Sequence, residues 1–288
     1  PDGYYTFDDL RPGTYTIAVL VATLPADVIQ TYDPDSTVDD QHTVTIASDG
    51  HYTDGDFGYQ GSASVGDLVW LDSNGDGAQS GEVGIPGVVL TLTFASGWEI
   101  TATTASDGSY SFGGLTGGAY TVTVDTTTLP TGAVLTTANQ PLTVTLGSTQ
   151  DYTLADFGYQ RQAQLTGHIF EDTDGNGLQN GAEPDLPNIT VIITDSLGLT
   201  QTVTTDANGN YTANVPVDST TSPTDTVIVD VDETTLPAGA VQTAGTDPDS
   251  VEVTAGTATD AGNDGYQIQG VVEGVVYTDV NQNGAYDA

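Results

Sequence analysis

The chain has 288 residues, of which 40 are acidic and only 2 are basic, and its formal net charge is −38. A surface this negative repels nucleic acids and anionic membranes and attracts divalent cations, so we expect no nucleic-acid partner. The absence of cysteine excludes disulfides and thiol chemistry. No stretch reaches the ~18 apolar residues of a membrane-spanning helix, and a hydrophobic fraction of 37% is sufficient for small β-sheet cores.

Short motifs recur in a constant order along the chain. An acidic loop begins at Asp72, Asp172 and Asp279, with spacings of 100 and 107 residues. The closing motif D-F-G-Y-Q of residues 56–60 returns 100 residues later, and a variant follows after another 107. Such a period predicts a series of similar small domains in a fragment of a longer protein. The predicted parts are the C-terminal part of a repeat (1–60), two complete repeats (61–161 and 162–268), and the N-terminal strand and calcium loop of a further repeat (269–288).

Within the first complete repeat, short runs of alternating apolar residues are separated by turn residues. Alternate side chains share one face of a strand, as at Val88, Leu90 and Leu92 or at Tyr120 and Val122. Seven strands with turns every ~8–15 residues predict an all-β fold, a Greek-key β-sandwich of immunoglobulin-like architecture. The predicted strands span residues 65–71, 87–95, 98–105, 110–112, 119–124, 142–146 and 152–159.

One aromatic residue stands at the same position of each repeat, two residues before the acidic loop. Trp70, Phe170 and Tyr277 share this register. Large aromatic side chains contribute much of the buried area of small domains. We therefore expect all three to lie in the cores of their repeats.

The acidic loops have the residue pattern of the first half of an EF-hand calcium loop. That pattern has oxygen ligands at positions 1, 3 and 5, a Gly at 6, a backbone carbonyl at 7 and a bidentate carboxylate at 12. Glu183 stands at position 12 of the second loop, and Glu82 at position 11 of the first. The predicted calcium ligands are Asp72, Asn74, Asp76, Ala78 and Glu82 in the first loop, Asp172, Asp174, Asn176, Leu178 and Glu183 in the second, and Asp279, Asn281, Asn283, Ala285 and Asp287 in the third.

The alternative interpretation is that these runs are ordinary solvated turns, because Asp, Asn and Gly are common turn residues. Three copies in a chain of net charge −38 favour the metal. Magnesium is less suitable because it keeps several of its waters. Ca2+ is therefore the expected cofactor, and its expected role is structural, because an ion that binds only the folded form stabilises it.

The repeats resemble a known family. Residues 66–79, 84–88 and 107–112 are similar to the B-type repeats of bacterial serine-aspartate-repeat surface adhesins, and residues 170–179 extend the resemblance to the second repeat. The resemblance implies prealbumin-like, calcium-binding β-sandwiches that hold a distal ligand-binding region away from the cell. It implies that the ion ligands include Asp72, Asn74, Asp76, Asp172, Asp174 and Asn176. The chain has no lysine, which excludes the Lys–Asn isopeptide bond of some relatives.

No catalytic pattern stands out, and we expect no enzyme. The histidines lack zinc-type spacing, and neither a nucleophile elbow nor a phosphate-binding P-loop occurs. The leading hypothesis is an extracellular structural segment of a cell-surface stalk or secreted filament. In this hypothesis calcium rigidifies repeats that contact neighbouring repeats or other copies of the chain. The alternatives are an adhesive module that recognises a surface ligand and an accessory module of a secreted enzyme.

Overall fold

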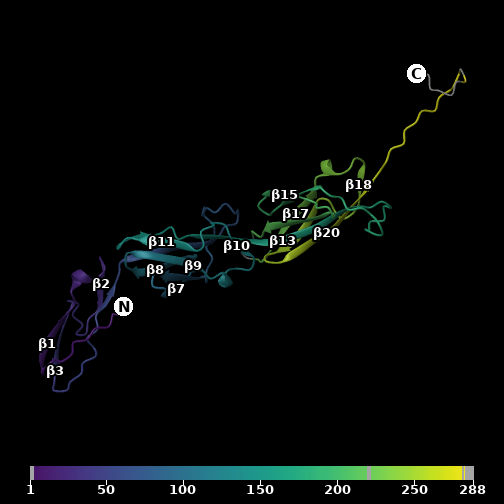
Figure 1. Cartoon of the computed structure of the whole chain (residues 1–288). Helices are drawn as coiled ribbons and strands as arrows, with labels where there is room; N and C mark the ends of the chain where they lie inside the picture. Colours follow the sequence, from purple (N-terminus) through teal and green to yellow (C-terminus); the bar gives the residue numbers. More distant parts are fainter. Residues whose placement is uncertain (1–2, 219–221, 281, 283–288) are drawn as a thin grey trace. The chain divides into compact units, whose positions relative to one another are not determined.

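Strands make up almost all of the regular structure (Figure 1). The computed structural model describes residues 3–218, 222–280 and 282. The prediction of an all-β fold is confirmed by these strands. The chain divides into two compact units, residues 1–160 and 161–288. In the described part of the chain, no helix has the length and apolar character needed to cross a membrane.

The first 60 residues contain two antiparallel strand pairs. β1 (Gly13–Ala18) pairs with β3 (Gln41–Ile46) over its whole length. β2 (Ile29–Tyr32) pairs with β4 (Gly58–Gln60), with an irregularity in the register near the end of β2. In β1 every second residue is partly shielded from solvent, as expected for a strand with one face toward other protein atoms.

Residues 61–160 form a β-sandwich of two sheets. One sheet is antiparallel throughout and has the order β7 (Glu99–Thr103), β6 (Val89–Phe94), β9 (Gly118–Val124), β11 (Leu142–Leu146). Its strands alternate between apolar residues that face the other sheet and threonines that are more exposed. This alternation is typical of a sheet with one solvated face.

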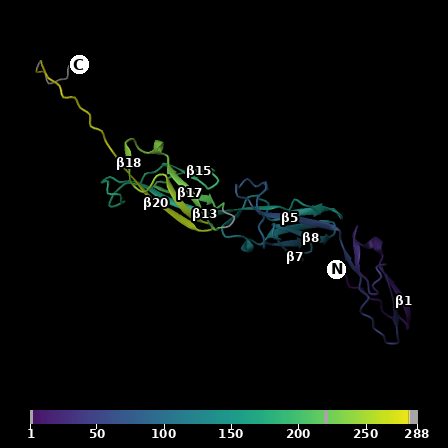
Figure 2. The same cartoon turned by 180° about the vertical axis from the view of Figure 1, so that it is seen from behind.

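The other sheet of this sandwich is centred on β5 (Ala63–Leu71). β5 pairs antiparallel with β8 (Ser109–Leu115), which lies beside it in Figure 2. It pairs in parallel with β12 (Asp151–Tyr152) and with the first residues of β13 (Phe157–Glu171). β10 (Ala133–Leu135) pairs with β13. Because β5 has neighbours on both edges, most of its residues are buried up to the point where the acidic loop begins.

A single apolar cluster fills the space between the two sheets. Val88, Leu90 and Leu92 are fully buried, and Tyr120 and Val122 are 4% and 0% exposed. The predicted inward faces are therefore confirmed. Full burial of a side chain of this size contributes roughly 1.5–3 kcal/mol, so the cluster is the main source of stability of this repeat.

The second unit repeats the sandwich. Its antiparallel sheet has the order β15 (Thr200–Thr204), β14 (Thr190–Thr194), β17 (Thr224–Val231), β19 (Asp249–Thr254). These strands pack on a second sheet through an apolar cluster of their own. The two clusters explain why the chain folds as two units.

The second sheet of this unit is built on the later residues of β13. β13 pairs antiparallel with β16 (Asn210–Pro216) and in parallel with β20 (Ala258–Ile268). β20 in turn pairs antiparallel with β18 (Ala240–Ala244). β13 thus ends, as β5 does, at an acidic loop.

Two predicted strands differ from the structure. The strand expected over 98–105 begins only at Glu99, and Trp98 is 64% exposed, because the turn closed by the Gly97 amide on the Phe94 carbonyl (2.9 Å) includes it. The strand expected over 152–159 is interrupted between β12 and β13. There the Asp156 carboxylate accepts from the Leu68 amide at 3.1 Å, which replaces a ladder hydrogen bond.

Three single-turn 3-10 helices were not predicted. They are η1 (Val21–Thr23), η2 (Thr126–Thr128) and η3 (Glu233–Thr235), and each precedes a Leu-Pro pair. The carboxylates of Asp125 and Asp232 cap η2 and η3 by accepting backbone N–H groups. The recurring Thr-Leu-Pro signature therefore marks the end of a short helical turn.

The expectations for the last part of the chain are corrected by the structure. No strand forms within residues 269–280, and Tyr277 is 39% exposed instead of lying in a core. A strand needs a partner for its hydrogen bonds. No described segment pairs with these residues, so the strand expected there has nothing to pair with.

The other two aromatic anchors are confirmed as core residues. Trp70 is 2% exposed and Phe170 is 0% exposed. Each ring lies over a glycine of the closing motif. A Cβ on Gly158 would stand 2.7 Å from a ring carbon of Trp70, and a Cβ on Gly265 would stand 2.7 Å from Phe170. The repeated glycine is therefore needed for close approach of the aromatic ring.

We expect Gly158→Ala to destabilise the first unit by about 1–3 kcal/mol, because the added methyl group overpacks the space under Trp70. Gly113→Ala is the matched control, since a Cβ there meets no atom within 4 Å. Denaturant unfolding followed by tryptophan fluorescence measures both variants. Equal midpoints for the two would contradict the packing role of Gly158.

Candidate metal centre

Each acidic loop begins with a buried aspartate at the end of a central strand. Asp72 follows β5 and is 0% exposed. Its backbone amide donates to the Tyr159 carbonyl at 2.9 Å, which ties the start of the loop to the closing motif of the same repeat. The buried strand thus places one carboxylate in a fixed position under the loop.

The first loop curls around this carboxylate. The Gly77 amide donates to Asp72 Oδ2 at 2.8 Å. Gly75 and Gly77 have φ angles of +71° and +74°, a conformation that glycine adopts without steric cost. Asn74 and Asp76 are exposed, and their side chains accept from backbone amides within the loop. The loop therefore has the tight turn that the pattern predicts.

Glu82 closes the first loop. Its Oε1 accepts from the Ser73 amide at 2.8 Å. Two other oxygens of this loop, Asp72 Oδ1 and Glu82 Oε2, are buried and have no hydrogen-bond partner among the described residues. A buried carboxylate oxygen without a partner is costly. A hard cation bound between such oxygens would remove that cost, so the residues of this loop fit Ca2+.

The second loop has the same construction. Asp172 is 0% exposed, and its backbone amide donates to the Tyr266 carbonyl at 3.0 Å. Its carboxylate accepts from the amides of Gly175 and Gly177 at 2.7 and 2.8 Å. Hydrogen bonds from Thr243 and from three backbone amides of the loop hold the pKa of Asp172 below its usual value. Asp172 is therefore a carboxylate at neutral pH.

Three carboxylates meet in the second loop. Oxygens of Asp172, Asp174 and Glu183 all lie within 4.8 Å of one another. Glu183 Oε1 accepts from the Thr173 amide at 2.8 Å, as Glu82 does from Ser73 in the first loop. Glu82 at position 11 and Glu183 at position 12 thus take equivalent places.

The remaining predicted ligands of the second loop are less convergent. Asn176 is exposed, and its side chain bonds to Asp174 and to the Leu178 amide. The Leu178 carbonyl accepts from the Asn180 side chain at 3.1 Å, and the Leu178 side chain is 68% exposed. In the first loop, the Ala78 amide donates to Asp76. An ion in these loops would need the carbonyls at position 7 to exchange such partners.

The third predicted loop falls largely outside the described residues. Asp279 is described and is partly exposed. The other predicted ligands of that loop are not among the described residues: Asn281, Asn283, Ala285 and Asp287.

Two glutamines that support the loops were not predicted. Gln160 Nε2 donates to the Ser73 carbonyl at 3.2 Å, and Gln267 Nε2 donates to the Thr173 carbonyl at 3.5 Å. Both residues end the closing motif that the repeats share. The recurrence of Gln at this place was the signal that could have identified them.

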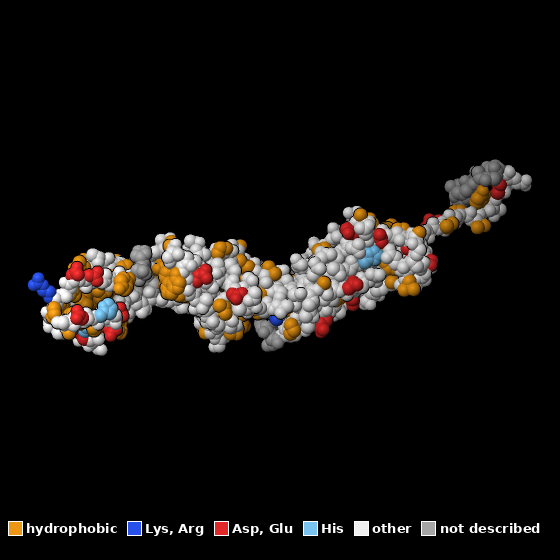
Figure 3. Space-filling view, turned by 60° about the horizontal axis from the view of Figure 1, so that its bottom comes forward, with side chains coloured by type: hydrophobic (Ala, Val, Ile, Leu, Met, Phe, Trp, Pro, Cys, Tyr) orange, Lys and Arg blue, Asp and Glu red, His pale blue; other side chains and the backbone are white. Residues whose placement is uncertain are grey.

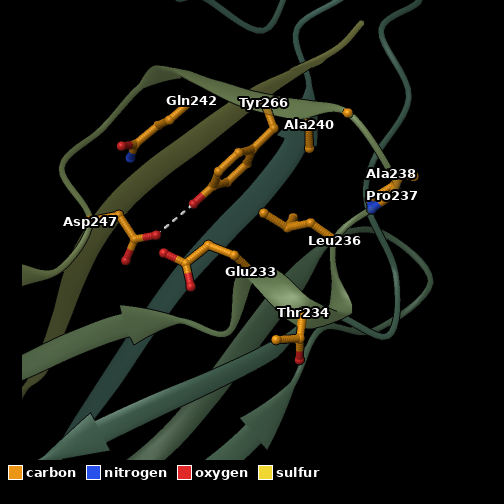
Figure 4. Close-up of a pocket in the computed structure, with 10 residues that line it drawn as sticks. Glu233, Thr234, Leu236, Pro237, Ala238, Ala240, Gln242, Asp247 and Tyr266 are labelled. Atoms are coloured by element: carbon orange, nitrogen blue, oxygen red, sulfur yellow. Dashed lines mark hydrogen bonds between the residues drawn. The ribbon is translucent and has the colours of Figure 1, made fainter. Parts of the chain in front are cut away.

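A hollow in the second unit gathers further acidic residues. It is lined by η3 and β18 and includes Glu233 and Asp247, whose carboxyl groups point toward each other in Figure 4. The Tyr266 hydroxyl donates to Asp247 at 2.9 Å. Tyr159 makes the corresponding bond to Gln140 in the first unit, so this contact is part of the repeat's framework.

Asp264 stands where the preceding repeat has the core residue Phe157. Burial, followed by the charges of Asp247 and Asp249, raises the pKa of Asp264 to about 7. One carboxyl group of the second sandwich is therefore held in an environment that favours its neutral form.

The arrangement defines a class of module. It is a β-sandwich with an acidic loop directly after a central strand, repeated in tandem. Residues 63–157 match the family described as the SdrD B-like domain. This part of the chain is an SdrD B-like domain, and the resemblance seen in the sequence is confirmed.

Curated relatives extend the similarity beyond this domain. Serine-aspartate repeat-containing protein F of Staphylococcus epidermidis is 33% identical over 235 residues, which cover 73% of this chain and 13% of that protein. Serine-aspartate repeat-containing protein E of Staphylococcus aureus is 36% identical over 162 residues, which cover 51% of this chain and 14% of that protein. The chain thus spans only a small part of each relative.

Among solved structures, the Bacillus anthracis TIE protein matches with a TM-score of 0.40 and 12% sequence identity. The match covers 88% of this chain and 51% of that chain.

We expect the stability of the second unit to decrease as pH rises from about 4 to about 7, because the pKa of Asp264 is raised in the fold to about 7. The folded state binds this proton more tightly than the unfolded state, so its stabilisation is complete at low pH and is lost as the group ionises. Asp264→Asn should flatten this dependence. Hydrogen exchange of β20 amides, compared between wild type and variant at each pH, measures the difference. Parallel pH profiles would contradict the assignment.

Proposed function

We propose that this chain is an extracellular segment of a cell-surface protein, in which calcium stiffens tandem β-sandwich repeats into a stalk or filament. The observation that carries the proposal is the pair of buried oxygens without partners, Asp72 Oδ1 and Glu82 Oε2, in the first loop. The three carboxylates that meet in the second loop support it independently. Oxygen donors at this density suit Ca2+, which takes six to eight oxygen ligands.

Charge gives a second reason for a cation. Acidic side chains are spread over the face shown in Figure 3, and basic ones occupy only small areas of it. In a chain of net charge −38, repulsion between carboxylates weakens the compact state. Ions held at the loops would offset part of this repulsion at the end of β5 and of β13. Calcium would therefore act on stability and on the stiffness of each repeat.

The relatives support the location. The chain shares an SdrD B-like domain and more than half of its length with serine-aspartate repeat-containing proteins of staphylococci. We infer that it serves, as the sequence resemblance implies, at the bacterial surface. Its role there is mechanical: the repeats hold another part of the protein at a distance from the cell.

The loops would contribute measurable stability. For an ion at 1 mM and a Kd of 10⁻⁴ M, the stabilisation is about 1.4 kcal/mol per site. We expect Asp72→Asn and Asp172→Asn each to remove one calcium from the binding stoichiometry and most of the calcium-dependent shift in Tm of the unit concerned. Asn retains an acceptor for the Gly77 or Gly177 amide, so the calcium-free fold should persist, which circular dichroism checks.

The matched control for these variants is Asp49→Asn, which removes one charge from an exposed turn with a φ of 58° that Asn tolerates. Isothermal titration and calorimetric unfolding measure all three variants. Loss of the same amount of calcium binding in the control and in the loop variants would count against the loops.

Chelation should loosen the repeats. We expect small-angle scattering of the wild-type chain to show greater flexibility when calcium is removed, because the loops lose the ion that fixes their carboxylates. The double variant Asp72→Asn, Asp172→Asn should show little response to calcium. Superimposable scattering curves for the wild type with and without calcium would refute the proposed stiffening, even if calcium binds.

A further inference from the structure

The first 60 residues carry a loop insertion that the other repeats lack. The hydroxyls of Tyr59 and Tyr266 donate to Asp40 and Asp247, as Tyr159 donates to Gln140, so these acceptors are equivalent. Thr23 of the Thr-Leu-Pro signature is 105 residues before its counterpart at 128, but Asp40 is only 100 before Gln140. Five additional residues therefore lie between the signature and Asp40. The next repeat has none, because both of its spacings are 107.

This inserted loop places two aspartates beside a histidine. Asp33 and Asp35 lie between β2 and β3, and His42 is in β3. His42 occupies the place of Leu142, which packs against the core of the next repeat. One ligand atom from each of the three residues lies within 4.8 Å of the other two. An apolar strand position has thus become the third corner of a polar cluster.

The histidine is oriented toward the aspartates. Its Nε2 is 2.9 Å from the Tyr52 hydroxyl. Its Nδ1 is buried, has no hydrogen-bond partner among the described residues, and lies 3.5 Å from Asp35 Oδ2. The His42 side chain is only 11% exposed. A partner on one ring nitrogen that leaves the other free is the arrangement of a histidine that binds a metal.

The buried aspartate is oriented in the same way. Asp33 is 5% exposed, and its Oδ2 accepts from the Gln30 side chain at 2.8 Å. Its Oδ1 has only a 3.5 Å contact with the Asp35 amide. A buried carboxylate beside a second carboxylate and a free imidazole nitrogen is unfavourable without a cation.

We propose that Asp33, Asp35 and His42 form a zinc site, separate from the acidic loops and of different chemistry. Imidazole combined with carboxylates suits Zn2+, whereas Ca2+ takes oxygen ligands. Two ligands about 2.1 Å from a tetrahedral zinc ion lie about 3.4 Å apart, close to the 3.5 Å between His42 Nδ1 and Asp35 Oδ2. Water would complete the fourth position. Gln30 and Tyr52 hold the ligands from behind.

The test is a titration of the full chain with zinc chloride in millimolar calcium, so that the acidic loops are saturated. We expect one zinc ion whose affinity falls at least about tenfold in His42→Leu and in Asp35→Asn. His42→Leu should fold, because leucine fills the equivalent place in the next repeat. His51→Leu, at an exposed histidine, is the control and should bind zinc like the wild type.

Nitrogen NMR of the histidine rings supplies a second measurement. Zinc should move the 15N signal of His42 Nδ1 far more than the signals of His51 and His168. Unchanged zinc affinity in His42→Leu, or a His42 ring that responds to pH but not to zinc, would overturn the proposal and leave an ordinary ion pair with Asp35. Neither result bears on calcium at the acidic loops, because calcium is saturating throughout.

Discussion

A carboxylate buried at the end of a central strand is the constraint on which the rest of each repeat depends. Asp72 and Asp172 are fully shielded in a chain whose net charge is already −38. Burial of a charge is tolerated only when it is paired and hydrogen-bonded. The glycines that turn the loop and the glutamate that closes it all serve this one requirement. The second loop meets it more fully with amide donors, and the first leaves oxygens for a cation.

The sandwich supports the loop from beneath. Tyr159 and Tyr266 accept the amides of the two buried aspartates through their carbonyls, and their hydroxyls anchor the opposite sheet through residues 140 and 247. The next residue of the motif, a glutamine, reaches the loop backbone. The closing motif therefore joins core, framework and loop in five residues. This explains why it recurs with the loop at the same spacing.

Patterns that depend on local periodicity were read correctly from the sequence. Inward residues such as Leu90 and Val122, and the turns that separate the strands, follow from alternation and glycine placement. What depends on distant partners was not accessible. Asp156 interrupts a strand because its side chain meets Leu68, 88 residues away. Tyr277 lacks a core because no described segment pairs with its neighbours. His42 looked ordinary until folding set two aspartates beside it.

The replacement of Phe157 by Asp264 has a consequence for folding in a tandem array. Adjacent repeats of similar sequence are prone to misfold by exchanging equivalent strands. If β20 took the place of the equivalent strand segment of the first sandwich, a carboxyl group would enter an apolar cluster where phenylalanine is fully buried. The reverse exchange would set a large ring among Asp247 and Asp249. Divergence at a single interior position thus gives each nascent repeat a chemical means of recognising its own strands.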